Sequence, residues 1–278
     1  GLELARSLCS QRNGQVILVG RAEANAAIQE ALDTLNQERK CASYFSVNLS
    51  DAAAVQRLAD WTKEQYPHLD GVFHAAGVTQ DGLMGEKDAA AFAATWEPKV
   101  EGLSTLNQSG LFANRPFLFL FSSLSAVFGN RGQADYAFAN ACLNEWSARF
   151  DSKAVDAAWS RVVSVAWPYV EEGGMQVDVL RIERMAAKTG MKAMPLRCVL
   201  PMVEAALSLE APVLALSFGE RARCQKLFEG SFSELSAHEV PVEVAVISHE
   251  VAYALLVDAV STVLQLDQSK LTVEAPLS

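Results

Sequence analysis

The stretch PFLFLFSSLSAVFGNRGQADYAFANACLNEW, residues 116–146, decides the fold class of this chain. It opens with a run of apolar and aromatic residues at 116–121, which is typical of a buried strand. A stretch of helical length and alanine-rich composition follows at Ala134–Phe150. A strand followed by a helix is the repeating unit of a parallel sheet that is covered by helices.

The same unit recurs on both sides of this stretch. Short β-rich apolar runs alternate with longer helical stretches, which predicts a Rossmann-like, doubly wound α/β fold. The expected strands are QVILVG at 15–20, ASYFSV at 42–47, DGVFHA at 70–75, PFLFLF at 116–121, RVVSVAW at 161–167 and PVLALS at 212–217. The expected helices are residues 1–11, Ala24–Glu38, Ala52–Tyr66, Ala89–Leu106, Ala134–Phe150 and Val199–Leu209.

Composition and charge exclude several classes of partner. The 23 basic residues against 33 acidic residues give a net charge of −10, and no basic stripe offsets it, so we expect no nucleic-acid partner. The longest dense apolar run, at 117–121, is far shorter than the roughly 18 residues of a membrane span, so we expect a soluble protein without a membrane partner.

The five cysteines lack the spacing of a metal site. They are scattered and never occur as CxxC, which argues against both a zinc site and a disulfide framework. We therefore expect no metal and a location in the reducing cytoplasm.

Four polar residues have a spacing that indicates chemistry. Ser123 ends a predicted strand, and Tyr136 opens the next helix thirteen residues later. Asn140 follows Tyr136 by four residues, so their side chains share one helix face. Lys99 lies in the preceding predicted helix.

These residues, with a further motif, resemble the ketoreductase domains of modular polyketide synthases, which belong to the short-chain dehydrogenase/reductase superfamily. The resemblance runs from residue 1 to about residue 228, and WPYVEEGGM at 167–175 is similar to the lid entrance of domains from assembly lines whose acyltransferase acts in trans. The motifs that carry it are Ser123, YAFAN at 136–140, Lys99 in EPKVEGL, and HAAGV at 74–78.

The resemblance implies a role for each of the four polar residues. Hydride that reaches a ketone carbon puts negative charge on the oxygen, which must be stabilised and protonated. Tyr136 is implied as the proton donor, and the Lys99 ammonium is implied to lower the phenol pKa from its ordinary value of about 10. Ser123 would hydrogen-bond the carbonyl oxygen. Asn140, in the place of the usual lysine, would order the water or backbone that resupplies protons.

The cofactor implied by the resemblance is NADPH. Arg21, directly after a strand, stands where the family reads the adenosine ribose, and a cation there suits a 2′-phosphate. Without the resemblance, Arg21 reads as an exposed arginine in a turn. Asn48 stands where an aspartate usually faces adenine. The remaining residues implied for cofactor binding are Gly1, Leu49, Ala75, Ala76, Gly77 and Pro168.

Stereochemistry follows from the loop after HAAGV. TQD at 79–81 aligns with the LDD of reductases that make a D-configured 3-hydroxyl group, and only Asp81 is retained. Phe128 stands where the opposite class has tryptophan, so we expect the D product. Asp81 also reads as an ordinary loop carboxylate. Gln133 and Met175 complete the implied substrate and stereocontrol residues.

Two domains are expected: the catalytic domain at 1–232, and a linker with the start of an acyl carrier protein at 233–278. The tail also reads as an amphipathic helix, 250–266, that docks on its own domain. A fold of this kind normally opens with a strand and a glycine-rich loop, which are absent before residue 2, so we expect the native polypeptide to continue upstream.

The expected reaction is reduction of a β-ketoacyl thioester that a phosphopantetheine arm delivers from an acyl carrier protein, beside neighbouring domains of the same synthase. Two alternatives remain open. One is a free-standing reductase of a small ketone. The other is a non-catalytic structural domain of a megasynthase.

Overall fold

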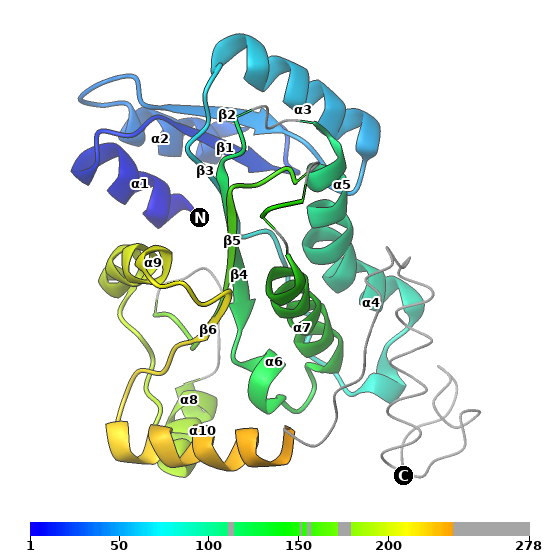
Figure 1. Ribbon diagram of the computed structural model, residues 1–278, viewed down its shortest axis with the longest axis vertical. Helices are drawn as coiled ribbons and strands as arrows, with labels where there is room; N and C mark the ends of the chain where they lie inside the picture. The colour runs from blue at the N-terminus through cyan, green and yellow to red at the C-terminus, as the bar shows by residue number, and fades with distance from the viewer. Residues whose placement is uncertain (111–113, 151, 155–156, 172–178, 236–278) are drawn as a thin grey trace.

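The computed structural model describes residues 1–110, 114–150, 152–154, 157–171 and 179–235. Figure 1 shows an α/β architecture in which parallel strands form a central layer. Helices α4, α5 and α7 cover one face of the strands, and α1 and α9 cover the other. The predicted fold class is therefore confirmed.

All six expected strands are present: β5 has the expected bounds, β4 starts one residue later and ends two residues later, and the other four are shorter by one to three residues. Every ladder between them is parallel, as the doubly wound pattern predicts. The strands are β1 (Val16–Gly20), β2 (Ala42–Ser46), β3 (Gly71–His74), β4 (Phe117–Ser123), β5 (Arg161–Trp167) and β6 (Val213–Ala215).

The described strands fall into two sheets. One has the order β1-β2 and the other has the order β3-β4-β5-β6. Within the described part of the chain, β1 and β3 therefore each hydrogen-bond a strand on one side only, and their other edges carry unpaired backbone groups. The β1 edge is accompanied by an exposed apolar side chain, Val19, which is 41% exposed.

The expected helices are confirmed, with one correction. The predicted helix Ala89–Leu106 is broken by a π-helical turn, η2, because Pro98 inside it has no N–H for the regular ladder. Helices α6, α8 and α10 were not anticipated. The helices are α1 (Leu2–Gln11), α2 (Ala26–Leu35), α3 (Ala52–Gln65), α4 (Ala89–Trp96), η2 (Glu97–Glu101), α5 (Gly102–Gln108), α6 (Ser125–Phe128), α7 (Ala134–Arg149), α8 (Val179–Thr189), α9 (Val199–Ser208) and α10 (Arg221–Leu235), with short 3₁₀ turns η1 (Met84–Glu86) and η3 (Leu196–Cys198).

Side-chain caps fix where three of the helices begin. The side chains of Asn25, Asp51 and Asp88 each accept a hydrogen bond from the backbone N–H three residues on. Each such cap contributes about 1 kcal/mol to helix stability. Helices α3 and α4 start at the expected residues, and α2 starts two residues later than expected.

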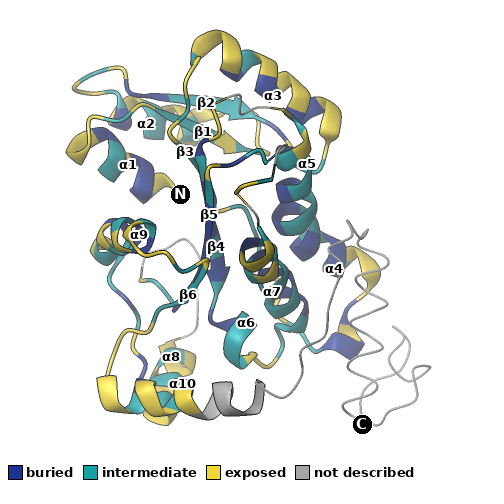
Figure 2. Ribbon diagram, in the orientation of Figure 1, coloured by how far each residue is buried: buried dark blue, intermediate teal, exposed yellow. Residues whose placement is uncertain are grey.

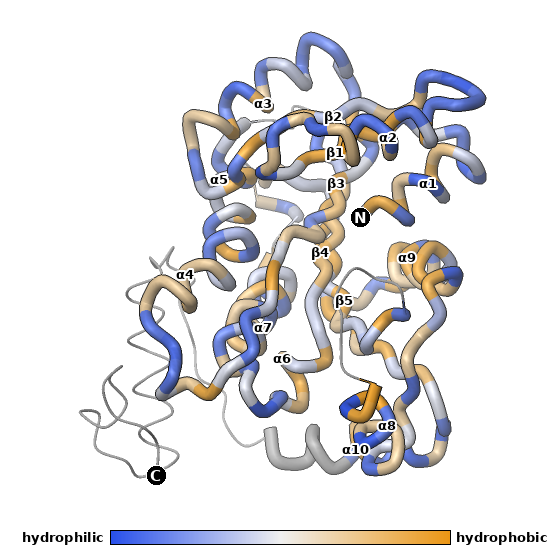
Figure 3. The backbone as a smooth tube through the Cα atoms, turned by 180° about the vertical axis from the view of Figure 1, so that it is seen from behind, coloured by the Kyte–Doolittle hydropathy of each residue, from blue (hydrophilic) through white to orange (hydrophobic). Residues whose placement is uncertain are grey.

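Strand β4 divides the core by its alternating side chains. Leu118 and Leu120 pack with residues of α5 and α7, whereas Phe119 packs with Val203 of α9 on the opposite face. All four side chains are buried (Figure 2). The tube view from behind shows the same strand as one of the most hydrophobic stretches (Figure 3). Because both faces of β4 are covered, only residues at its carboxyl end can face a cavity.

The expected domain boundary at 232/233 falls within α10, which extends to Leu235. The expected amphipathic segment 250–266 and the rest of the tail lie outside the described residues. In the part of the chain that the structure describes, no helix is both long and apolar enough to cross a membrane.

Candidate active site

The carboxyl ends of β3, β4 and β5 open into a cavity of about 910 Å³. Pockets of this size hold cofactors and small substrates, and in parallel sheets they lie at this edge. Sequence-predicted residues that line it are Gly1, Ala75, Gly77, Asp81, Lys99, Ser123, Phe128, Gln133, Tyr136 and Pro168.

Tyr136 lies in the first turn of α7 and is 7% exposed. Ser123 faces the same cavity from the last residue of β4. Its Oγ accepts the Ser125 backbone N–H at 3.2 Å, and its hydroxyl group also hydrogen-bonds Tyr136. The structure thus brings the predicted serine and tyrosine to one wall.

Asn140 lies one helical turn after Tyr136 and is completely buried. Its Nδ2 donates to the Tyr136 backbone carbonyl at 2.7 Å. Its Oδ1 has no hydrogen-bond partner among the described residues. Asn140 therefore lies behind Tyr136, outside the lining of the cavity, as a support for the first turn of α7.

Lys99 enters the site from the π-helical turn η2 and is 3% exposed. Its Nζ donates to the Phe121 carbonyl at 3.1 Å and lies 5.5 Å from the centre of the Tyr136 ring. Burial lowers the pKa of Lys99 to about 8. As predicted, Lys99 reaches the site from a different helical segment than Tyr136, and that segment is a π turn.

The pKa of Tyr136 differs from the sequence expectation. Burial of the phenol raises its pKa, and the Asp81 carboxylate adds to that increase. Hydrogen bonding to Asn140 and Ser123 lowers the pKa without cancelling the effect of burial. The expected lowering by Lys99 is therefore wrong for this arrangement, because desolvation of the phenolate dominates.

Three residues expected at the adenosine half of a cofactor lie outside the cavity. Arg21 directly follows β1, and Asn48 and Leu49 follow β2, so they meet at the carboxyl edge of the two-stranded sheet. Asn48 Oδ1 accepts the Ser50 N–H at 3.3 Å, and Leu49 packs against the α3 cluster. Ala76 also lies outside the described lining, between two residues that belong to it.

Asp81 is the centre of a polar network at the rim of the cavity. Gln133 Nε2 donates to Asp81 Oδ1 at 2.7 Å, and Arg181 of α8 donates to Oδ2 at 2.6 Å.

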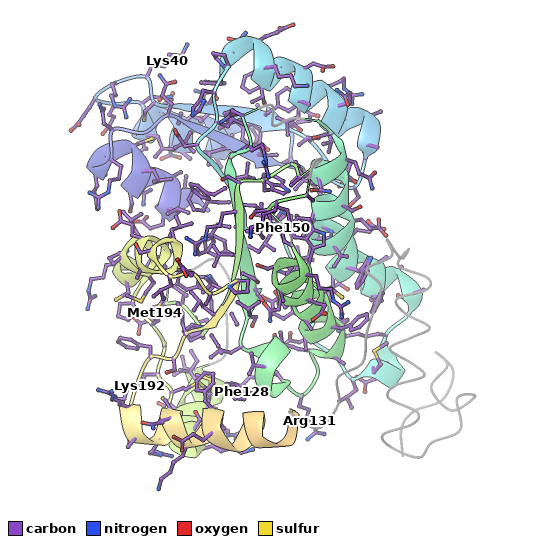
Figure 4. The ribbon with its side chains drawn as sticks, viewed as in Figure 1. Lys40, Phe128, Arg131, Phe150, Lys192 and Met194 are labelled. Atoms are coloured by element: carbon purple, nitrogen blue, oxygen red, sulfur yellow. The ribbon has the colours of Figure 1, made fainter. Side chains whose placement is uncertain are left out.

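Phe128 lies against Phe228 of α10, with ring centres 4.9 Å apart, and Figure 4 shows it just above that helix. Met175 lies outside the described residues.

Sequence reasoning missed two features beside this network. Helix α8 contributes six residues to the cavity lining. Its apolar residues at 179, 182 and 185 follow helical spacing, a signal that was present in the sequence. The second feature is a buried ion pair in which Lys87 Nζ lies 2.6 Å from Asp135, next to Tyr136. Only the fold brings these two residues together.

The lining fits a nicotinamide cofactor. Small residues, Ala75 and Gly77, lie where β3 ends, and a Cβ at Gly77 would come within 2.7 Å of Lys99 Cε. The backbone there is therefore close to the lysine, and small residues let a cofactor approach the backbone. Among the residues described, no three His, Cys, Asp or Glu side chains are grouped to hold a metal ion.

Comparisons with known proteins agree with this geometry. The family model "KR domain" matches residues 1–172. Polyketide synthase PksL of Bacillus subtilis is 33% identical over 196 residues, which are 70% of this chain and 4% of PksL. Polyketide synthase ThaG of Burkholderia thailandensis is 32% identical over 224 residues, which are 80% of this chain and 4% of ThaG.

A solved structure is similar over most of the described fold. It is a ketoreductase domain from the bacillaene assembly line, with a TM-score of 0.77 and 30% identity. The match covers 82% of this chain and 55% of the solved one. This chain thus spans about half of that domain and a small fraction of the curated synthases.

Proposed function

This chain belongs to the KR domain family of polyketide synthase ketoreductases, and from this premise we propose that it reduces a carrier-bound β-ketoacyl thioester with NADPH. Carbonyl reduction is the reaction of the family. The observation that carries the proposal is the convergence of Ser123, Tyr136 and Lys99 on one cavity from three different elements. A β-ketoacyl group with its ketone oxygen between Ser123 and Tyr136 would meet two hydroxyl donors.

The chain's own residues supply the oxygen and proton chemistry. The bound cofactor would supply the hydride. Ser123 donates its hydroxyl hydrogen to the bound ketone oxygen and holds that oxygen within reach of Tyr136. Tyr136 gives its phenolic proton to that oxygen, and its raised pKa keeps it protonated before the reaction.

Lys99 stabilises the phenolate that remains after proton transfer. Its Nζ donates to the Phe121 carbonyl and lies 5.5 Å from the centre of the Tyr136 ring. With a pKa of about 8, the amine is mostly protonated at neutral pH. Asn140 holds the first turn of α7 and thereby the position of the phenol.

We propose NADPH over NADH because of Arg21. Its position after β1, beside Asn48 and Leu49, is where the adenosine ribose would lie if the nicotinamide occupies the cavity. Replacement of Arg21 by Ala should reduce the preference of kcat/KM for NADPH over NADH about tenfold or more, since one charge-assisted contact is lost. An unchanged preference in Arg21→Ala would refute this part of the proposal.

The proposed product has the D-configured hydroxyl group. Asp81 and Phe128 both line the cavity, which is consistent with control of the side from which the substrate enters. The partners proposed are an acyl carrier protein with its phosphopantetheine arm and the neighbouring synthase domains. All five cysteines are free thiols, which supports a reducing, cytoplasmic setting.

A substrate comparison tests the proposal against a free-standing reductase. In the native protein, we expect kcat/KM for a β-ketoacyl pantetheine thioester to exceed that for a small cyclic ketone, with the D alcohol as the product by chiral chromatography. Equal or better turnover of the free ketone would favour the free-standing alternative. No NADPH oxidation with either substrate would favour a structural domain.

A further inference from the structure

Lys99 depends on an unusual backbone conformation. The π-helical turn η2 interrupts the α4–α5 rod, and the Gly102 N–H bonds the Glu97 carbonyl five residues earlier. Such turns are rare and often mark functional sites. Because Pro98 removes one donor from the ordinary ladder, the turn needs support from outside the helix.

That support comes from His74. It is the last residue of β3, is 2% exposed, and places Nε2 at 2.9 Å from the Lys99 backbone carbonyl. A carbonyl oxygen only accepts hydrogen bonds, so Nε2 carries the hydrogen. Burial lowers the pKa of His74 to about 4, which keeps the ring neutral near pH 7. A neutral imidazole can thus serve as a permanent donor in this site.

The contact connects two layers of the fold. Strand β3 belongs to the central sheet, and η2 lies among the helices that cover it (Figure 1). Three residues past His74, Gly77 leaves space for the Lys99 side chain. One short segment, 74–77, therefore holds the Lys99 carbonyl at one end and accommodates its aliphatic stem at the other.

Lys99 is consequently fixed at both ends. His74 holds its backbone, and the Phe121 carbonyl holds its Nζ beside Tyr136. If the His74 contact were lost, the π turn could relax toward a regular helix, which rotates and shifts the lysine relative to the phenol. A displacement of about 1 Å at a reaction centre can reduce a rate about 100-fold.

We propose that His74 is a positioning residue for ketone reduction, whose Nε2–H fixes the π turn that presents Lys99 to Tyr136. The inference rests on the proposed function for its kinetic consequence. His74 touches neither substrate nor cofactor, because it does not line the cavity. It acts through Lys99.

Two amide substitutions test whether the side chain at position 74 must reach the Lys99 carbonyl or only be polar. In His74→Gln the side-chain amide nitrogen comes near the original Nε2 position, whereas in His74→Asn it ends too short to reach the Lys99 carbonyl. In the native protein, H74N should lower kcat about 10- to 100-fold with the KM for NADPH changed by less than about threefold. H74Q should recover kcat to within about tenfold of wild type.

A matched control addresses folding. Leu120 pairs with His74 in the β3–β4 register and is equally buried, but it does not contact η2 through a hydrogen bond. Leu120→Val should reduce stability with kcat close to wild type. Equal losses of kcat in H74N and H74Q, or no loss in either, would overturn the proposal, as would a kcat loss in L120V that matches H74N.

A readout without turnover separates this inference from the proposed function. Hydrogen–deuterium exchange of peptides covering 97–103 should be faster in H74N than in H74Q and in L120V, because the η2 turn loses its outside support only in H74N. If the wild type proves inactive but this ordering holds, the proposed function fails and the structural part of the inference stands. Equal exchange in all three variants would remove the positioning role.

Discussion

Burial controls the protonation of the basic side chains nearest the reaction centre. Lys99 and His74 are both at least 97% buried, and desolvation of their charged forms lowers the pKa of each. The two shifts have different consequences near neutral pH. Lys99, with a pKa of about 8, stays mostly charged, whereas His74, with a pKa of about 4, stays neutral.

The lowered pKa of His74 predicts acid sensitivity. Its folded-state pKa of about 4 lies below its ordinary value of 6.5, so the unfolded chain takes up the proton first as pH falls. Stability is therefore lost between about pH 6.5 and pH 4. From pH 7 to pH 4.5 this residue should remove about 2 kcal/mol from the free energy of unfolding.

Urea unfolding of wild type and His74→Gln at the two pH values measures this contribution. The difference in unfolding free energy between the two proteins should shift by about 2 kcal/mol in favour of H74Q at the lower pH. A difference that does not vary with pH would show that His74 is protonated equally in the folded and unfolded chain.

At the scale of elements, one buried ion pair joins the segment before α4 to the start of α7. Lys87 and Asp135 are 5% and 1% exposed in their side chains, and their charged atoms lie 2.6 Å apart. Lys87→Met would leave a buried carboxylate without this partner, so we expect a loss of about 3–5 kcal/mol in unfolding free energy.

Two further variants check that assignment by chemical denaturation. The double variant Lys87→Met/Asp135→Leu should recover much of the loss, because it buries no unpaired charge. The exposed pair Arg6–Glu3 is the control, and Arg6→Ala should cost less than about 1 kcal/mol. A loss for K87M as small as that for R6A would contradict the account of the pair.

An exposed ion pair, Arg181–Asp81, connects helix α8 to the rim of the cavity. The Arg181 and Asp81 side chains are 44% and 38% exposed, so their ion pair contributes little to stability. Arg181 nevertheless lines the cavity and also donates to the Arg131 carbonyl at 3.0 Å. Arg181→Ala should raise the KM for the thioester several-fold and change Tm by less than about 4 °C.

The control is Arg12→Ala, which breaks a similarly exposed pair with Glu204 away from the cavity. It should leave the KM unchanged. If R181A and R12A have the same KM, the α8 contact has no part in substrate binding.

The elements that the sequence predicted best are those with a buried face. Strands such as β4 and β5 have five apolar residues among seven, and apolar, β-rich runs of this kind are typical of buried parallel strands. Helix α8 was missed because it buries none of its residues and follows a segment without helical pattern. The π turn at Lys99 was missed because Pro98 signals a break but not which of several conformations replaces the regular helix.

The candidate site could be predicted only for residues that lie at a fixed spacing within one strand–helix segment. Ser123, Tyr136 and Asn140 lie in a single strand–helix segment, so their proximity follows from local structure. The His74–Lys99 and Lys87–Asp135 contacts span 25 and 48 residues, and packing of separate elements creates them. The raised pKa of Tyr136 likewise depends on burial, which spacing does not report.

At the scale of the whole molecule, Ser123 and the residue proposed to select NADPH follow strands of different sheets. Ser123 ends a strand of the four-stranded sheet, whereas Arg21 follows β1 of the two-stranded sheet. Among the described residues, β1 is an edge strand of the first sheet and β3 is an edge strand of the second, and the two strands do not hydrogen-bond each other.

The central claim is that Tyr136 protonates a ketone oxygen in this cavity. Its most direct test is NADPH oxidation with a β-ketoacyl pantetheine thioester by the native protein and its Tyr136→Phe variant. We expect the variant to lose about 10²- to 10⁴-fold in kcat while its Kd for NADPH stays within about threefold of wild type. Turnover by Y136F at the wild-type rate, with NADPH still bound, would contradict the account.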